Sequence, residues 1–111
     1  MQTLEQYGLT ERDSQTIFGV LQKYSDEVSR AVLFGSRAKG VYHKGSDIDL
    51  ALDGNSITFK TLRNIKSDLE DSSLPYNLDV VAFATLSNQA LKEHIGRVGK
   101  VIWHTSEFVE V

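Results

Sequence analysis

The sequence predicts a small α/β fold in which a mixed β-sheet is packed with helices. Amphipathic stretches with helical spacing alternate along the 111 residues with short apolar or alternating stretches typical of strands. Their order is helix, strand, short helix, strand, helix, strand, helix, which is common in α/β sandwiches with helices mostly on one face. We expect a single domain over residues 1–111, with a loose tail at about 105–111.

The first half of the chain is predicted to form a helix, a buried strand and a short helix. Thr10 can cap a helix over residues 11–24, where apolar residues recur on one face. Residues 31–34 are a continuous apolar run closed by Gly35, as in a strand that is buried on both faces. Residues 36–40 fit one or two helical turns, and a polar loop follows.

The second half is predicted to repeat the alternation of strand and helix. Residues 47–52 begin with alternating polar and apolar side chains, as in a strand with one functional face. A second amphipathic helix is expected over residues 57–71 and a third strand over residues 78–83. A third helix over residues 87–98 and a short strand over residues 100–103 complete the prediction.

Charge, cysteine content and hydropathy exclude several classes of protein. Twelve Lys and Arg against fifteen Asp and Glu give a net charge of −3, so direct nucleic-acid binding is not expected. The absence of Cys excludes a disulfide scaffold and a thiolate zinc site. No apolar run approaches the length of a membrane span, and the first residues do not resemble a signal peptide. We therefore expect a cytoplasmic protein with no membrane partner.

Three acidic residues on two predicted strands indicate a site for divalent metal ions. Side chains alternate along a strand, so Asp47 and Asp49 should point the same way, about 6.5 to 7 Å apart. Their repulsion raises a pKa or attracts a cation, and carboxylate oxygens favour Mg²⁺ or Mn²⁺. Asp79 lies between apolar residues of another strand, where an acid is unfavourable unless it joins the same site. All three are predicted to be catalytic and to hold two metal ions about 4 Å apart, as in the two-metal route to in-line phosphoryl displacement.

A glycine-serine turn follows the first predicted strand and is typical of a phosphate site. Gly35 lets a phosphate approach the backbone, and Ser36 offers a hydroxyl beside exposed N–H groups. Arg37 and Lys39 add positive charge, although both could be solvated helix residues. With Ser46, directly before the acidic pair, these residues form the predicted binding site for a metal-chelated nucleoside triphosphate.

The histidines are given no catalytic role by the sequence. His43 lies in the polar loop and is interpreted as a surface residue. His94 falls on the third predicted helix and His104 near the tail, and neither has a neighbour at ligand spacing. A zinc site is therefore not expected.

With these motifs the sequence resembles the minimal nucleotidyltransferase (MNT) family of the DNA polymerase β-like superfamily. The family signature is Gly-Ser, then Asp-x-Asp, then a carboxylate in a later strand; it is matched by Gly35, Ser36, Asp47, Asp49 and Asp79. The resemblance implies a polymerase β-like nucleotidyltransferase palm that uses ATP and two Mg²⁺ ions, with Mn²⁺ as an alternative. Many members resemble antitoxins that transfer AMP to a tyrosine of a small helical HEPN toxin.

The predicted activity is that of a protein adenylyltransferase acting in a toxin-antitoxin pair. A chain of 111 residues holds only the catalytic palm, so a HEPN-type partner in a hetero-oligomer is expected to present the acceptor hydroxyl. Asp79 is the best candidate to help deprotonate that hydroxyl before it attacks the α-phosphate and releases pyrophosphate. Two alternatives stay open: a non-catalytic antitoxin that masks its partner, and a catalytic subunit that modifies a small molecule such as an aminoglycoside.

Overall fold

The sheet of the computed structural model has four strands in the order β3-β2-β1-β4, and the structure describes residues 4–105. β1 (Arg30–Phe34) lies between β2 (Ile48–Asp53) and β4 (Lys100–His104) and is antiparallel to both. β3 (Leu78–Ala82) pairs in parallel with β2 and forms one edge of the sheet. The predicted mixed sheet is therefore confirmed.

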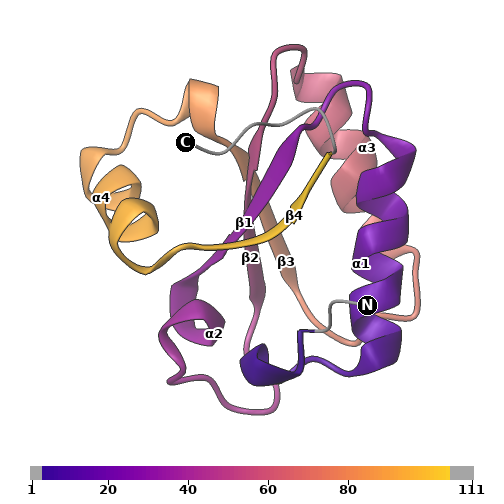
Figure 1. Ribbon diagram of the computed structural model, residues 1–111, viewed down its shortest axis with the longest axis vertical. Coiled ribbons are helices and arrows are strands. Elements are labelled where there is room, and N and C mark those ends of the chain that lie inside the picture. Colours follow the sequence, from indigo (N-terminus) through magenta and orange to yellow (C-terminus); the bar gives the residue numbers. More distant parts are fainter. Residues whose placement is uncertain (1–3, 106–111) are drawn as a thin grey trace.

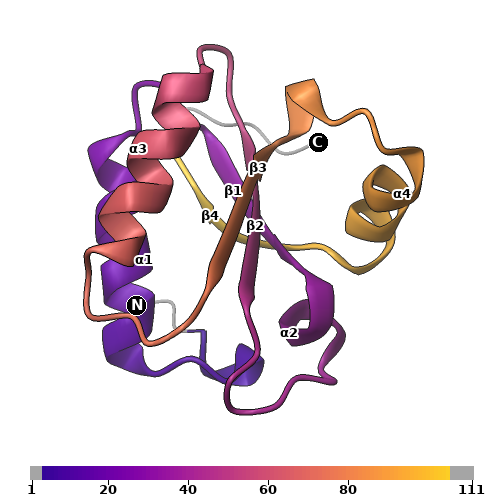
Figure 2. The same cartoon turned by 180° about the vertical axis from the view of Figure 1, so that it is seen from behind.

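Helices cover both faces of this sheet (Figure 1, Figure 2). α1 (Glu11–Lys23) and α3 (Phe59–Glu70) lie side by side on one face. The short helix α2 (Gly35–Lys39) and α4 (Gln89–Val98) lie on the other side. The expectation that helices gather mostly on one face is wrong, because the apolar side of α4 packs on the face opposite α1 and α3.

Alternation along the strands separates two hydrophobic cores. The larger one lies between the sheet and the α1 and α3 helices, and its fully buried members include Ile17, Leu21, Leu33, Ile48, Leu50, Leu52, Ile65 and Leu69. The smaller one lies under α4 and is built from Val32, Phe34, Ala51 and Ile95. Because successive side chains of a strand point to opposite faces, the residues of β2 between Ile48, Leu50 and Leu52 face α4. Asp49 is one of these.

Thr10 caps α1 as the sequence predicts, and together with Asp13 it forms a capping box. The Thr10 hydroxyl accepts from the N–H of Asp13, and the Asp13 carboxylate accepts from the N–H of Thr10, each at 3.0 Å. The hydroxyl of Tyr76, in the loop before β3, donates to the same carboxylate at 3.0 Å. The start of α1 is thus tied to the segment that leads into the edge strand.

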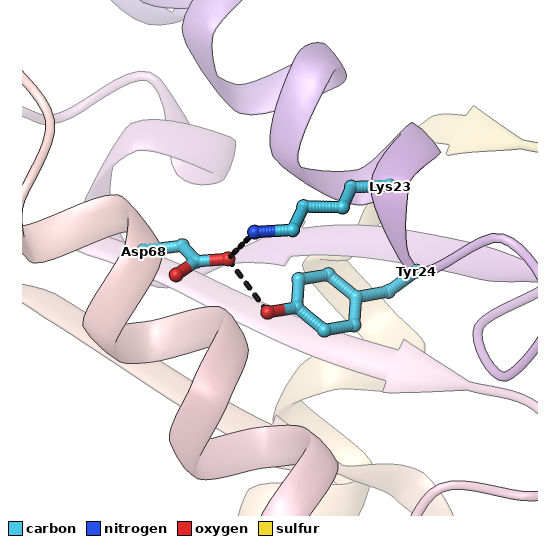
Figure 3. A network of polar contacts seen from close by, with 3 residues as sticks. All are labelled: Lys23, Tyr24 and Asp68. Carbon is cyan, nitrogen blue, oxygen red and sulfur yellow. Dashed lines mark hydrogen bonds and ion pairs between the residues drawn. The ribbon is translucent and has the colours of Figure 1, made fainter.

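A second polar contact joins the other end of α1 to α3 (Figure 3). One carboxylate oxygen of Asp68 accepts from the Tyr24 hydroxyl at 2.6 Å and from the Lys23 ammonium at 2.9 Å. The hydrogen bond from Tyr24, and then that from Lys23, lower the pKa of Asp68. These contacts fix the two helices of the larger core relative to each other.

Each α-helix and strand begins and ends within two residues of its predicted limits, whereas the two short 3-10 helices, Glu5–Tyr7 and Phe83–Thr85, were not predicted. The expected loose tail at about 105–111 is tied down at its first residue, where the N–H of Thr105 donates to the carbonyl of Ser29 at 2.9 Å. Residues 106–111 lie outside the described residues. Over residues 4–105, no helix is long and apolar enough to cross a membrane.

Candidate active site

Two of the predicted carboxylates are direct neighbours across the sheet. Asp49 of β2 is the register partner of Asp79 on β3 and of Phe34 on β1. Register partners point to the same face, so both carboxylates lie on the face that carries α4. Asp79 is exposed on the edge strand, whereas Asp49 is only partly exposed. Asp47 is exposed and lies one residue before β2.

The electrostatic environment of Asp49 connects the three acids. Burial, followed by the charges of Asp79 and Asp47, raises the pKa of Asp49 from 3.8 to about 6. The Arg37 guanidinium acts in the opposite direction and is the weakest of these influences. Asp79 and Asp47 therefore each repel the Asp49 carboxylate, and a cation would relieve that repulsion.

The chemistry of the carboxylates fits divalent metal ions. Over residues 4–105, no three acidic or histidine side chains are already gathered closely enough to hold an ion between them. The ion pairs seen over the same residues join Lys23 to Asp68 and Arg30 to Asp53 and include none of the three acids. Carboxylates without a basic partner are donors that Mg²⁺ and Mn²⁺ accept.

The predicted phosphate turn lies directly against this acidic group. Gly35 is the first residue of α2 and has a φ of +75°, a conformation that favours glycine. A Cβ atom at this position would collide with the Asp49 carboxylate. Two features therefore favour glycine at position 35: its positive φ, and the close approach of the Asp49 carboxylate. Ser36 follows it and is partly exposed.

Arg37 is not placed where a nucleotide could reach it, and its predicted role is corrected. The residue is 1% exposed, and its guanidinium donates to the carbonyls of Ser46 at 2.8 Å and Tyr7 at 2.9 Å. The ring centroids of Tyr76 and Tyr42 lie 4.7 and 5.4 Å from its Cζ atom. Arg37 therefore joins the segment before α1 to the loop that leads into β2.

Ser46, like Arg37, is buried and hydrogen-bonded to other groups of the protein. It is 7% exposed, and its hydroxyl accepts from the N–H of His43 at 2.9 Å. Its carbonyl is occupied by Arg37, so the predicted nucleotide contact of Ser46 has no geometric support. Lys39 is exposed in the last turn of α2, at the opposite end from Gly35, and its nucleotide contact stays a prediction.

One neighbour of the turn was not predicted. The Gly35 N–H donates to Nε2 of His94 on α4 at 3.2 Å. The His94 ring also meets the Phe34 ring edge-on, with centroids 6.2 Å apart. A signal existed in the sequence, because His94 is three residues after Leu91 and four before Val98, on the inward stripe of the helix. His43 is exposed in its loop, as expected.

Comparison with known proteins agrees with this geometry. Residues 15–108 match the family described as "Polymerase beta, Nucleotidyltransferase". The chain belongs to this nucleotidyltransferase family. It is also 36% identical over 78 residues to the probable protein adenylyltransferase MntA of Haemophilus influenzae (strain ATCC 51907 / DSM 11121 / KW20 / Rd). These 78 residues cover 69% of this chain and 68% of that protein. The predicted resemblance is confirmed, and the family generally uses ATP and divalent metal ions.

Solved structures of toxin-antitoxin complexes share the fold. A chain from the crystal structure of a toxin-antitoxin with AMP-PNP superposes with a TM-score of 0.69 at 24% identity, covering 85% of this chain and 75% of that chain. A chain from the complex of tri-AMPylated Shewanella oneidensis HEPN toxin with MNT antitoxin gives a TM-score of 0.66 at 20% identity, with 89% and 76% covered. At these identities the likeness shows only that the fold is shared.

Proposed function

We propose that this nucleotidyltransferase is a protein adenylyltransferase that transfers AMP from MgATP to a tyrosine of a helical HEPN-type toxin, for which it is the antitoxin. The observation that carries the proposal is the pairing of Asp49 with Asp79 beside a glycine turn that contacts Asp49. The relative named as an adenylyltransferase and the complexes of MNT antitoxin with HEPN toxin support the choice of acceptor. A cytoplasmic location and a hetero-oligomer belong to the same proposal.

The three carboxylates are assigned the metal ions. Asp47, Asp49 and Asp79 would hold two Mg²⁺ ions, or Mn²⁺ in their place. Bound there, the ions would activate the attacking oxygen and neutralise the pyrophosphate that leaves. The raised pKa of Asp49 supports this assignment, because a cation would favour the ionised form that repulsion and burial now disfavour.

The protein's own groups bind and orient the nucleotide. Gly35 and Ser36 would receive the triphosphate tail through their N–H groups and the serine hydroxyl. Because the turn contacts Asp49, a phosphate on the turn would lie beside the carboxylates. This placement would expose the α-phosphate to a nucleophile arriving from the open edge of the sheet.

Asp79 is suited to receive the proton of the acceptor. It is exposed on edge strand β3, where a hydroxyl presented by another protein can approach. Its carboxylate would take the tyrosine proton as the phenolic oxygen bonds to the α-phosphorus. The bond from that phosphorus to the bridging oxygen breaks, and pyrophosphate leaves. The two strand acids thus differ in role because they differ in exposure.

The test is AMP transfer to the partner protein. The chain would be incubated with labelled ATP, Mg²⁺ and a purified HEPN-type partner, and the partner analysed by intact-mass spectrometry. We expect addition of AMP units to tyrosine, loss of transfer in the D47N/D49N double variant, and retention of transfer in D53N, which changes an acid farther along the same strand. Unchanged transfer by the double variant would refute the assignment.

The two alternatives predict different results in the same assay. A masking antitoxin would protect cells from the toxin with D47N/D49N as well as with the unaltered chain, and would leave no AMP on the partner. A subunit acting on a small molecule would label an aminoglycoside and leave the protein unlabelled. Either result would overturn the proposed acceptor.

A further inference from the structure

The N–H group of the phosphate turn already has an acceptor. Gly35 is the first helical residue of α2, so its N–H has no partner within that helix. His94 provides the partner through Nε2 at 3.2 Å. An imidazole nitrogen that accepts must be unprotonated, so the ring proton lies on Nδ1 in this arrangement.

The position of His94 depends on two independent contacts. Its ring packs edge-on against Phe34, the residue before the turn, at an interplanar angle of 81°. The next residue of α4, Ile95, is 2% exposed in the smaller core and holds the helix on the sheet. Ile95 thus anchors α4 on the sheet independently of the His94 ring, so loss of the ring's hydrogen bond need not displace the helix.

A phosphate oxygen and the His94 nitrogen would need the same donor. A backbone N–H makes one well-aligned hydrogen bond, and its strength falls steeply when two acceptors share it. If the triphosphate binds at Gly35 as proposed above, its oxygen must replace Nε2. The imidazole must then rotate away from the turn.

We propose that His94 is a positioning residue of the phosphate turn, whose hydrogen bond to the Gly35 N–H and the nucleotide exclude each other. This inference rests on the proposed nucleotide site. In the absence of nucleotide, His94 accepts from the Gly35 N–H, which has no partner within α2. Nucleotide binding breaks that bond, so His94 sets the affinity for the triphosphate without touching the reacting atoms.

The first test compares affinities for α,β-methylene-ATP with Mg²⁺, an analogue whose α–β bond is not cleaved, by calorimetry on the full chain. H94F keeps a ring against Phe34 but has no acceptor, so we expect tighter binding by about fivefold, the size of one net hydrogen bond. H94Q offers an amide oxygen and should return the affinity toward that of the unaltered protein. E93Q, at an exposed neighbouring position, is the matched control.

The second test follows the two atoms directly by ¹⁵N NMR. On adding the analogue, the His94 Nε2 resonance should move toward that of a non-hydrogen-bonded nitrogen, and the Gly35 amide should shift. In H94F the Gly35 amide should differ from the unaltered protein before addition and coincide with it after. H94A gives the same readout if phenylalanine disturbs the packing.

The outcomes separate this inference from the proposed function. Two results together would refute the role of His94 and leave the nucleotide site standing. In the first, the analogue shifts the Gly35 amide resonance but not that of His94 Nε2. In the second, H94F and H94A bind the analogue with unaltered affinity. If the analogue binds without moving the Gly35 amide, the nucleotide site itself is wrong. A weaker affinity in H94F and H94A would also contradict the exclusion.

Discussion

Asp49→Asn should stabilise the metal-free protein at neutral pH, although it removes a residue of the proposed active site. Burial and the charges of Asp79 and Asp47 raise the pKa of Asp49 to about 6 in the folded protein, above the ordinary 3.8. The folded state therefore binds this proton more tightly than the unfolded chain. The resulting stabilisation is complete below pH 3.8 and is lost as the pH rises through about 6.

The magnitude follows from the two pKa values. The difference between about 6 and 3.8, at about 1.4 kcal/mol for each pH unit, gives an upper limit of about 3 kcal/mol. Asp49 is partly exposed, so solvent screening reduces the expected gain to about 1 kcal/mol. In a domain of this size that gain corresponds to a rise in Tm of about 4 °C.

The assay is thermal unfolding in EDTA between pH 4 and 8. We expect the Tm of D49N to exceed that of the unaltered protein above pH 6, with the gain disappearing near pH 4. D53N is the matched control on the same face of β2, because Asp53 accepts from Arg30 at 3.0 Å and its replacement should not stabilise. If D49N were no more stable than the unaltered protein at pH 7.5, the reasoning from burial and from the charges of Asp79 and Asp47 would be refuted.

Three further substitutions test the supports of the site. R37K should lower the free energy of unfolding by about 3 kcal/mol, because an ammonium cannot match the buried guanidinium contacts. Urea unfolding would measure this loss. A loss below about 1 kcal/mol would contradict the structural role of Arg37. G35A should abolish binding of MgATP in calorimetry while D53N binds normally, because a Cβ meets Asp49. Y24F should cost about 1 kcal/mol in urea unfolding by removing the hydrogen bond to Asp68, and an unchanged midpoint would show that this contact is not stabilising.

The acids of the site could be predicted because strand geometry is local. Alternation along β2 places Asp49 on one face of the sheet, although Asp47 lies one residue before the strand. An acid between apolar neighbours marks Asp79 as unusual in its strand. Parallel pairing of their two strands then brings Asp49 and Asp79 side by side. The place of Gly35 directly after a buried strand was likewise predictable, whereas its role in binding phosphate stays a prediction.

The errors concern contacts between segments that are distant in sequence. The charge of Arg37 beside the motif indicates a nucleotide contact, but the carbonyls of Tyr7 and Ser46 converge on it only in the folded chain. An amphipathic helix can pack on either face of a sheet, so the apolar pattern of α4 did not reveal on which face of the sheet it lies. That packing also brings His94 to the Gly35 N–H, 59 residues away in the sequence.

The most direct test of the proposed site is where Mn²⁺ binds. Substoichiometric Mn²⁺ should broaden the amide resonances of Gly35, Asp47, Asp49 and Asp79 in ¹⁵N NMR spectra of the unaltered protein, and this broadening should be lost in D49N. Broadening that is confined to other acidic surfaces, or that persists unchanged in D49N, would contradict a metal and nucleotide site at this edge of the sheet.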